Sequence, residues 1–301
     1  LYICTMFNRY ILLILALVCY LSGNAQLSTS KLFFDHLTTE EGLAHNYILS
    51  IFQDEDGFVW LGSDNGLNRY DGQHIDILSS NTKPALGGNR IRRIIQDKSK
   101  TLWILHENGL DMMDHYTQHI RSFLYGRELK KHILGFGLDD NGDLAAFTES
   151  DILLYNSNSG SFDIKQTAPA NFLFSAFVKC GNRYYLGTRR HGIIVYNENW
   201  KLLEHIYPTS IQGGILEDGL ISLLRVDSNG SIWSVMAGLC IQKYDPVTRI
   251  VQTYPLSAHS VINREVRDII ELNADYMLVG TFNGLYRLHK RTFQAIVEEG
   301  E

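Results

Sequence analysis

The chain has 301 residues, of which 45% are hydrophobic and 20% charged, and its formal net charge is −6 at pH 7. This composition is typical of a globular protein with a sizeable core, and it excludes a mainly disordered chain. The negative charge argues against a nucleic-acid-binding surface, which usually needs a clustered excess of Lys and Arg. Five prolines, sixteen tyrosines and fourteen phenylalanines favour many short β-strands.

The first predicted element is a signal peptide over residues 1–25. A short basic start, Met6 to Arg9, precedes an apolar run from Ile11 to Leu21. The segment Ser22 to Ala25 then has small residues at the −3 and −1 positions of a cleavage site before Gln26. A membrane anchor is the alternative, but the run of about eleven apolar residues is short against the roughly 20 that a spanning helix needs. We therefore expect export and cleavage.

Export would place the cysteines in a compartment where a disulfide can form. Cys19 follows Val18 where lipidation needs a small residue, so we expect no lipid anchor. Cys180 and Cys240 remain after cleavage, in a compartment where a disulfide could form. They occupy unlike places in different repeats, and we therefore expect free thiols.

A repeat of about 43 residues runs from about Asn46 to the end of the chain. Its aromatic or apolar anchor recurs at spacings of 43, 42, 40, 48 and 45 residues. An Asp stands six residues before the anchor in four copies, and a Gly-apolar pair follows it in five. The third copy is the most degraded, with Ser150 to Ile152 where the glycine is expected. The anchors are Trp60, Trp103, Ala145, Tyr185, Trp233 and Leu278.

Each copy predicts four strands. In the first copy these are Ile48 to Gln53, Phe58 to Ser63, Leu67 to Tyr70 and Ile75 to Leu78, separated by glycine-containing turns. Glycine supplies the positive φ that short hairpin turns require. Four strands in about 43 residues predict the blade of a β-propeller, with the anchor packed between neighbouring blades.

We therefore predict an all-β fold, a β-propeller of four-stranded blades over residues 26–301 with six recognisable blades. Lys31 to Leu37 is similar to a fourth strand and precedes the first full copy, while the sixth copy has its own fourth strand at Phe293 to Val297. We expect an incomplete seven-bladed ring that is truncated at its C-terminal end; a six-bladed ring with a spare strand is the alternative. The repeats span about 40–80, 81–125, 126–166, 167–208, 209–256 and 257–301.

The run from Gly42 to Gly72, GLAHNYILSIFQDEDGFVWLGSDNGLNRYDG, resembles the repeat of the two-component regulator propeller family. Copies two, four, five and six match the pattern less fully, and copy three matches it poorly. The resemblance implies a non-catalytic periplasmic sensor of a Bacteroidetes-type hybrid two-component regulator, which responds to oligosaccharides and controls polysaccharide utilisation. It also implies a longer, homodimeric parent anchored in the inner membrane, with a second propeller and an immunoglobulin-like domain beyond this chain.

Two other classes of function stay open: a secreted propeller-fold carbohydrate-active enzyme, and a pure protein-interaction propeller. The enzyme would need paired carboxylates that converge on one face. His115 and His119 would lie roughly 13 Å apart on a strand, too far to share a metal ion. Asp54 to Asp56 and Asp139 to Gly142 lack a full calcium loop and recur where turns need Asp and Gly. We therefore expect no metal site and no cofactor.

The candidate ligand-binding residues lie in loops. The turns between second and third strands share a face with the long connections between blades, and loops on a rigid scaffold often carry function. Arg189, Arg190 and His191 form the most unusual of these turns, and could hold an anionic or hydroxyl-rich sugar through forked hydrogen bonds. Asn89 and Arg90 are further candidates. The alternative is that these residues form solvated turns or contact the rest of the receptor.

Three asparagines stand fourteen residues before an anchor: Asn46, Asn89 and Asn171. They could line the central opening of the ring. Asparagine at the start of a strand more often bonds the backbone in a turn, however, and we favour that structural role.

Overall fold

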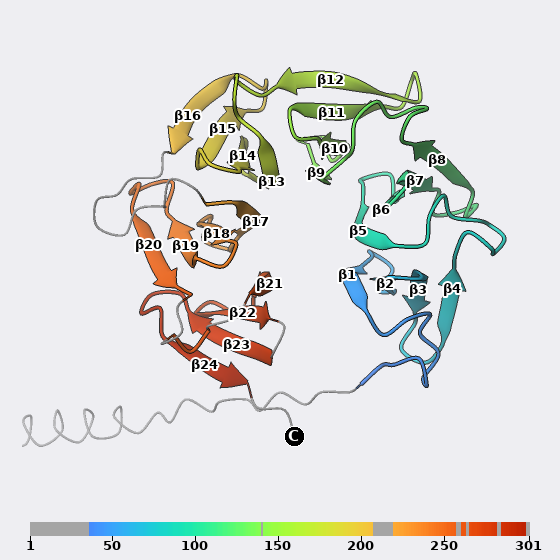
Figure 1. Ribbon diagram of the computed structural model, residues 1–301, viewed down its shortest axis with the longest axis horizontal. Helices are drawn as coiled ribbons and strands as arrows, with labels where there is room; N and C mark the ends of the chain where they lie inside the picture. The colour runs from blue at the N-terminus through green and yellow to red at the C-terminus, as the bar shows by residue number, and fades with distance from the viewer. Residues whose placement is uncertain are drawn as a thin grey trace, which may run out of the picture. The chain divides into compact units, whose positions relative to one another are not determined.

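The computed structural model describes residues 36–139, 141–206, 219–256, 260–262, 265–281 and 284–298. The predicted signal peptide and most of the Lys31 to Leu37 segment lie outside these residues. Residues 36–299 form one compact unit. The described part is all-β, with six four-stranded sheets whose strands are paired in chain order, so the predicted propeller of six blades is confirmed. In Figure 1 the sheets follow one another around a central opening, with the first strand of each innermost.

The strands of the six blades have the following bounds. Blade 1 contains β1 (Ile48–Gln53), β2 (Val59–Ser63), β3 (Gly66–Tyr70) and β4 (Ile75–Leu78); blade 2 contains β5 (Ile91–Gln96), β6 (Leu102–His106), β7 (Gly109–Met113) and β8 (Ile120–Leu124). Blade 3 contains β9 (Gly135–Leu138), β10 (Leu144–Phe147), β11 (Asp151–Asn156) and β12 (Ser161–Thr167); blade 4 contains β13 (Phe174–Cys180), β14 (Arg183–Thr188), β15 (Ile193–Asn197) and β16 (Leu202–Ile206). Blade 5 contains β17 (Ile221–Val226), β18 (Ile232–Met236), β19 (Cys240–Tyr244) and β20 (Val251–Pro255); blade 6 contains β21 (Val266–Glu271), β22 (Tyr276–Thr281), β23 (Gly284–His289) and β24 (Ala295–Glu298).

The spacing of six residues between Asp and Trp has a direct structural cause. In blade 5 the indole Nε1–H of Trp233 donates to Oδ2 of Asp227 at 2.9 Å, while Oδ1 of the same carboxylate accepts from the backbone of the following turn. One aspartate therefore closes the turn between the first two strands and holds the indole between blades. The same indole–carboxylate bond joins Trp60 to Asp54 at 2.7 Å and Trp103 to Asp97 at 2.8 Å.

The turn glycines adopt the predicted conformation. Gly57 has φ +91° in the turn that Asp54 closes, a region that side chains rarely occupy. In the second copy the equivalent residue is Lys100, which also has a positive φ of +61°. Since this turn forms without glycine, the hydrogen bonds to the aspartate determine its conformation, and glycine lowers the strain of adopting it.

In the part of the chain that the structure describes, the core consists of five hydrophobic clusters, each shared by two consecutive blades. Trp60, for example, packs against Ile91, Ile94 and Leu102 of the next blade. In blade 3 the anchor is only Ala145, and the neighbouring blade fills the space with Tyr184 and Trp200, whose rings stack with centroids 4.1 Å apart. The degraded third copy is therefore compensated from blade 4.

Among the described residues no such cluster joins blade 6 to blade 1. Ile51 of β1 is 71% exposed, whereas the residue at the same register position of the other five blades is 0–8% exposed. On blade 6, Leu285 is half-buried where its five equivalents are 0–1% exposed. The two sheets at the ends of the series thus each present one uncovered apolar face. The buried equivalents of Ile51 are Ile94, Phe136, Phe177, Leu224 and Ile269.

Candidate functional site

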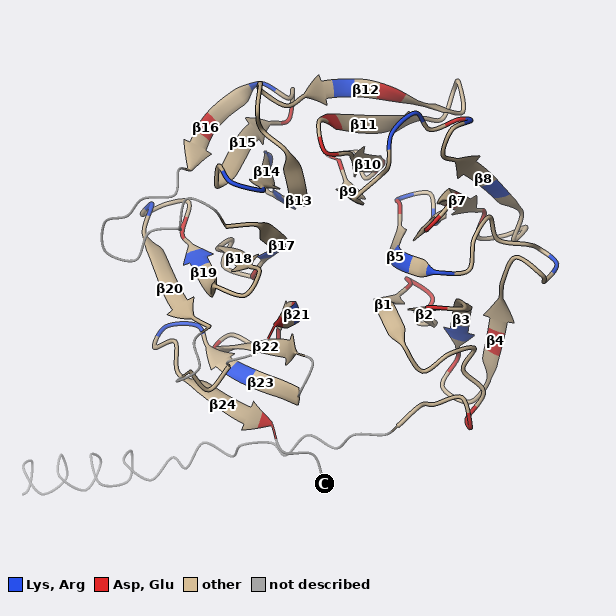
Figure 2. Ribbon diagram, in the orientation of Figure 1, with Lys and Arg blue, Asp and Glu red and all other residues tan. Residues whose placement is uncertain are grey.

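A cavity with a volume of about 590 Å³ lies at the inner strands. It is lined by β1, β5, β17 and β21, with residues of β22 and β23 at one side. Four arginines and one aspartate give its lining a formal charge of +3, although the whole chain is acidic. Figure 2 shows the basic segment of β5 and the charged segment of β21 at the central opening. The charged residues are Arg92, Arg93, Arg225, Arg267 and Asp268.

A β-bulge places two of these arginines. The register between the first and second strands shifts in five of the six blades, and in β5 the shift between Ile91 and Arg93 leaves Arg92 without a partner in the ladder. The equivalent shift in β21 does the same for Arg267. Bulges re-aim side chains and interrupt pairing, so residues at this position are available to the cavity.

Arg93 occupies a register position at which the six blades differ. It pairs across the ladder with Leu105, two residues after the anchor of its blade. The equivalent residue is Asp268 in blade 6, and small or apolar elsewhere. The guanidinium of Arg93 lies close to Gly135 of β9, where an added Cβ would be 3.5 Å from Cζ of Arg93, an ordinary contact; the glycine itself is required by the ring of Phe147, which that Cβ would meet at 2.8 Å. The other equivalents of Arg93 are Ser50, Gly135, Ala176 and Leu223.

The positive charge of the cavity is only partly compensated. Arg225 pairs with Asp268 at 2.8 Å and donates to the carbonyl of Leu224 at 3.1 Å. Arg267 lies 3.5 Å from Glu265. For Arg93, no carboxylate among the described residues lies within 4 Å. Burial lowers the pKa of its guanidinium, the charge of Arg225 lowers this pKa further, and the charge of Asp268 raises it. An arginine that is desolvated beside a second cation favours an additional anion.

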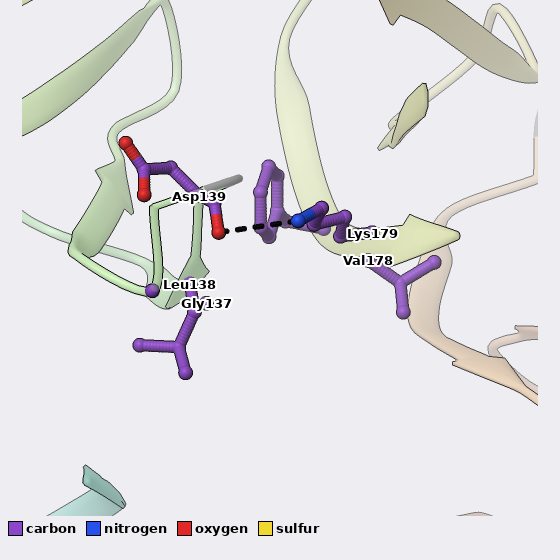
Figure 3. A pocket seen from close by; sticks show the side chains of 7 residues that line it. Gly137, Leu138, Asp139, Val178 and Lys179 are labelled. Atoms are coloured by element: carbon purple, nitrogen blue, oxygen red, sulfur yellow. Dashed lines mark hydrogen bonds between the residues drawn. The ribbon is translucent and has the colours of Figure 1, made fainter. Parts of the chain in front are cut away.

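A second, smaller cavity of about 420 Å³ lies between β9 and β13 (Figure 3). Lys179 reaches across it and donates to the backbone carbonyl of Asp139 at 3.3 Å. A side chain at Gly137 would meet the ring of Phe177 at 2.4 Å, which explains the glycine. The cavity adjoins the turn of the third copy, where Ala145 provides no indole to Asp139, and its polar lining is one lysine and one carboxylate.

The turn predicted as a ligand site lies on the surface of blade 4. Arg189 pairs with Glu149 of blade 3 at 2.7 Å, with both side chains half exposed. His191 packs on Phe172, with ring centroids 4.3 Å apart, and its carbonyl contacts the ring of His205. Arg190 is exposed. Arg189 thus contacts the neighbouring blade, and His191 packs within its own repeat.

Asn89 and Arg90 connect blades 1 and 2. Arg90 pairs with Asp64 at 2.8 Å, and Oδ1 of Asn89 accepts from the backbone of Ser80 at 2.7 Å. The carbonyl of Asn89 accepts from Gly66 at 2.7 Å, which joins an inter-blade connection to a turn between second and third strands. These contacts agree with the structural role expected of the asparagines, and Asn46 likewise bonds the backbone of Thr39.

The structure does not bring the two groups of predicted residues together, since they lie on blades 2 and 4, and neither group lines the two cavities. The sequence prediction missed the cavity arginines. The sequence holds one signal for them: at the position of Arg93 the other copies have serine, glycine, alanine, leucine or aspartate, but the cavity that this arginine borders is formed by strands far apart in sequence.

Three other expectations concern cysteines, histidines and membrane spans. Cys180 and Cys240 are free, as predicted. His115 lies in the turn between β7 and β8, so the strand spacing assumed for His115 and His119 is wrong; its ring pairs with Asp56 at 2.9 Å. Within the described ranges there is no group of His, Cys, Asp and Glu suited to a metal ion, and no helix long and apolar enough to cross a membrane.

Comparison with known proteins supports the resemblance read from the repeat. The family model described as two component regulator propeller matches residues 42–65. No curated protein matches the chain.

Several solved structures share the fold. The extracellular domain of the putative hybrid two component system BT3049 from B. thetaiotaomicron is 19% identical, with a TM-score of 0.68 over 89% of this chain and 37% of that one. The corresponding domain of BT4673 from the same organism is 21% identical, with a TM-score of 0.69 over 84% and 36%. Virginiamycin B lyase from Staphylococcus aureus is 12% identical, with a TM-score of 0.66 over 85% of each chain. The chain thus spans little more than a third of the two extracellular domains.

Proposed function

We propose that this chain is a non-catalytic, ligand-sensing propeller of a hybrid two-component regulator, and that its ligand is an oligosaccharide. The observation that carries the proposal is the regulator propeller repeat at residues 42–65, which lies in a ring with the same fold as extracellular domains of such regulators. The differences between its repeats at the first strand concentrate charged residues at a cavity. A rigid ring with a lined cavity is suited to binding a ligand.

The rest of the proposed receptor follows from the resemblance and from the lengths of the similar domains. Those domains are more than twice as long as this chain, which leaves room for the second propeller and the immunoglobulin-like domain. We place the chain in the periplasm after cleavage of its signal peptide, as part of a homodimeric receptor anchored in the inner membrane. A ligand that binds this propeller would signal by favouring one arrangement of that receptor.

An enzyme on the same scaffold is the competing function, because a propeller fold serves lyases as well as sensors. Glycoside hydrolysis requires two carboxyl groups that flank the bond to be broken. The larger cavity is lined by one carboxylate, Asp268, which already pairs with Arg225. This lining favours binding over hydrolysis.

Thermal-shift screening of oligosaccharides on the receptor's complete extracellular region tests the proposal. A ligand at 100 times its Kd stabilises the folded state by about 2.7 kcal/mol, which raises the Tm by several degrees. We expect one class of oligosaccharide to do so and to be recovered chemically unchanged. If no oligosaccharide raises the Tm, the sensing role is wrong, and if the stabilising sugar is cleaved, the chain is an enzyme.

A further inference from the structure

The inner strands of the propeller carry a positive charge that neighbouring carboxylates compensate only in part. Arg93 is half-buried, and its pKa is lowered first by burial and then by a second arginine, Arg225, while Asp268 opposes the shift. A partly desolvated charge that its neighbours do not fully compensate destabilises a protein, so a residue of this kind usually serves a function. Here it borders a cavity of about 590 Å³, large enough for a small oligosaccharide.

We propose that this central cavity binds an acidic oligosaccharide, whose carboxylate or sulfate group is held by Arg93 together with Arg92 and Arg267. The proposal rests on the proposed function and names the ligand class of the same receptor. Arg225 has a different role: its pairing with Asp268 fixes both side chains at the wall and leaves Asp268 less able to neutralise Arg93. Guanidinium groups match the planar geometry of carboxylates and the oxygens of sulfate by forked hydrogen bonds.

The apolar part of the same cavity fits the rest of such a ligand. Ile51, Ile270 and Leu278 also line it. The less polar faces of sugar rings can cover these side chains while the acidic group faces the arginines. The positive lining would also attract an acidic sugar at long range, and salt would weaken this attraction.

The proposal is tested by calorimetric titration of the complete extracellular region with four probes. These are digalacturonate, a sulfated galactose disaccharide, neutral galactobiose, and inorganic sulfate. We expect at least one acidic disaccharide to bind more than about tenfold tighter than galactobiose and sulfate, with an affinity that falls as salt rises. A carboxylate or a sulfate preference is read from the first two probes.

Two variants separate a binding role from a structural one. Arg93→Gln should weaken the acidic probe at least about tenfold, while its unliganded Tm stays the same or rises, because a desolvated charge is removed. Arg127→Gln, on an exposed loop, should change neither quantity.

Several results would overturn the inference. These are failure of both acidic disaccharides to bind, equal binding of galactobiose, or unchanged affinity in Arg93→Gln. If a neutral oligosaccharide then stabilises the protein, the sensing function stands and the ligand class alone is wrong.

Discussion

Removing the indole N–H of Trp233 tests whether the repeated Asp and Trp act as one structural unit. Trp233 is fully buried and donates to Asp227, which is 4% exposed. Trp233→Phe keeps a ring between blades 5 and 6, where the indole stacks on Phe293. The carboxylate loses a partner that it cannot replace with water, which costs about 1.5–3 kcal/mol for a hydrogen bond to a charged group. The smaller ring adds a packing loss of about 1 kcal/mol.

The coupling between the two residues isolates the hydrogen bond. Asp227→Asn retains an Oδ1 that accepts from the backbones of Asn229 and Ser231, so the turn stays closed. In a double-mutant cycle followed by urea unfolding, we expect a coupling energy of about 1–2 kcal/mol between Trp233→Phe and Asp227→Asn. Additive losses, within about 0.5 kcal/mol, would refute the interpretation of the repeat as an indole–carboxylate unit.

Blade 3 provides the matched control. Asp139 closes the same kind of turn, with Oδ1 accepting from Asn141 and Asp143, but the anchor there is Ala145. Asp139→Asn should therefore cost less free energy of unfolding than Asp227→Asn.

Three further predictions concern blade contacts and thiol chemistry. In urea unfolding of this 301-residue chain, Ile94→Ala should lower the free energy of unfolding by about 2–5 kcal/mol, whereas Ile51→Ala at the same register position should lower it by under about 0.5 kcal/mol. Equal losses in the two variants would contradict the exposure of the Ile51 face. Burial raises the pKa of Cys240 to about 11, so only about a thousandth of this thiol is ionised at pH 8, and alkylation should stay slow until the protein unfolds; fast labelling at pH 8 would contradict its burial. Arg189→Ala and Glu149→Ala should each lower the free energy of unfolding by less than about 1 kcal/mol, since their ion pair is half exposed; a larger loss would make it a structural link.

The periodic features of the fold were predictable from sequence because each depends on local chemistry. Asp and Gly at a fixed distance before the anchor specify a turn, and the anchor itself specifies a packing face, so the blades and their order follow. The compensation in blade 3 was not predictable in this way. Trp200, at φ +60° after the third strand of blade 4, replaces an indole missing from another blade, and only the three-dimensional arrangement reveals it.

The candidate site was harder to predict for a similar reason. Charged loops often bind ligands, which favours the loops of Arg189 and Arg90 as sites, yet the side chains of these residues form ion pairs within the ring. The cavity arginines lie on first strands, where Arg92 and Arg93 look like ordinary strand residues. Their importance depends on the bulge and on the proximity of β5, β17 and β21, which are far apart in sequence.

Hydrogen exchange with and without the stabilising oligosaccharide would locate the ligand most directly. It compares amide exchange across the wild-type extracellular region, without any substitution. We predict slower exchange on ligand binding in β5, β17 and β21, with little change in the turn at residues 189–191. Protection confined to that turn, or to the outer strands, would contradict a binding site in the central cavity.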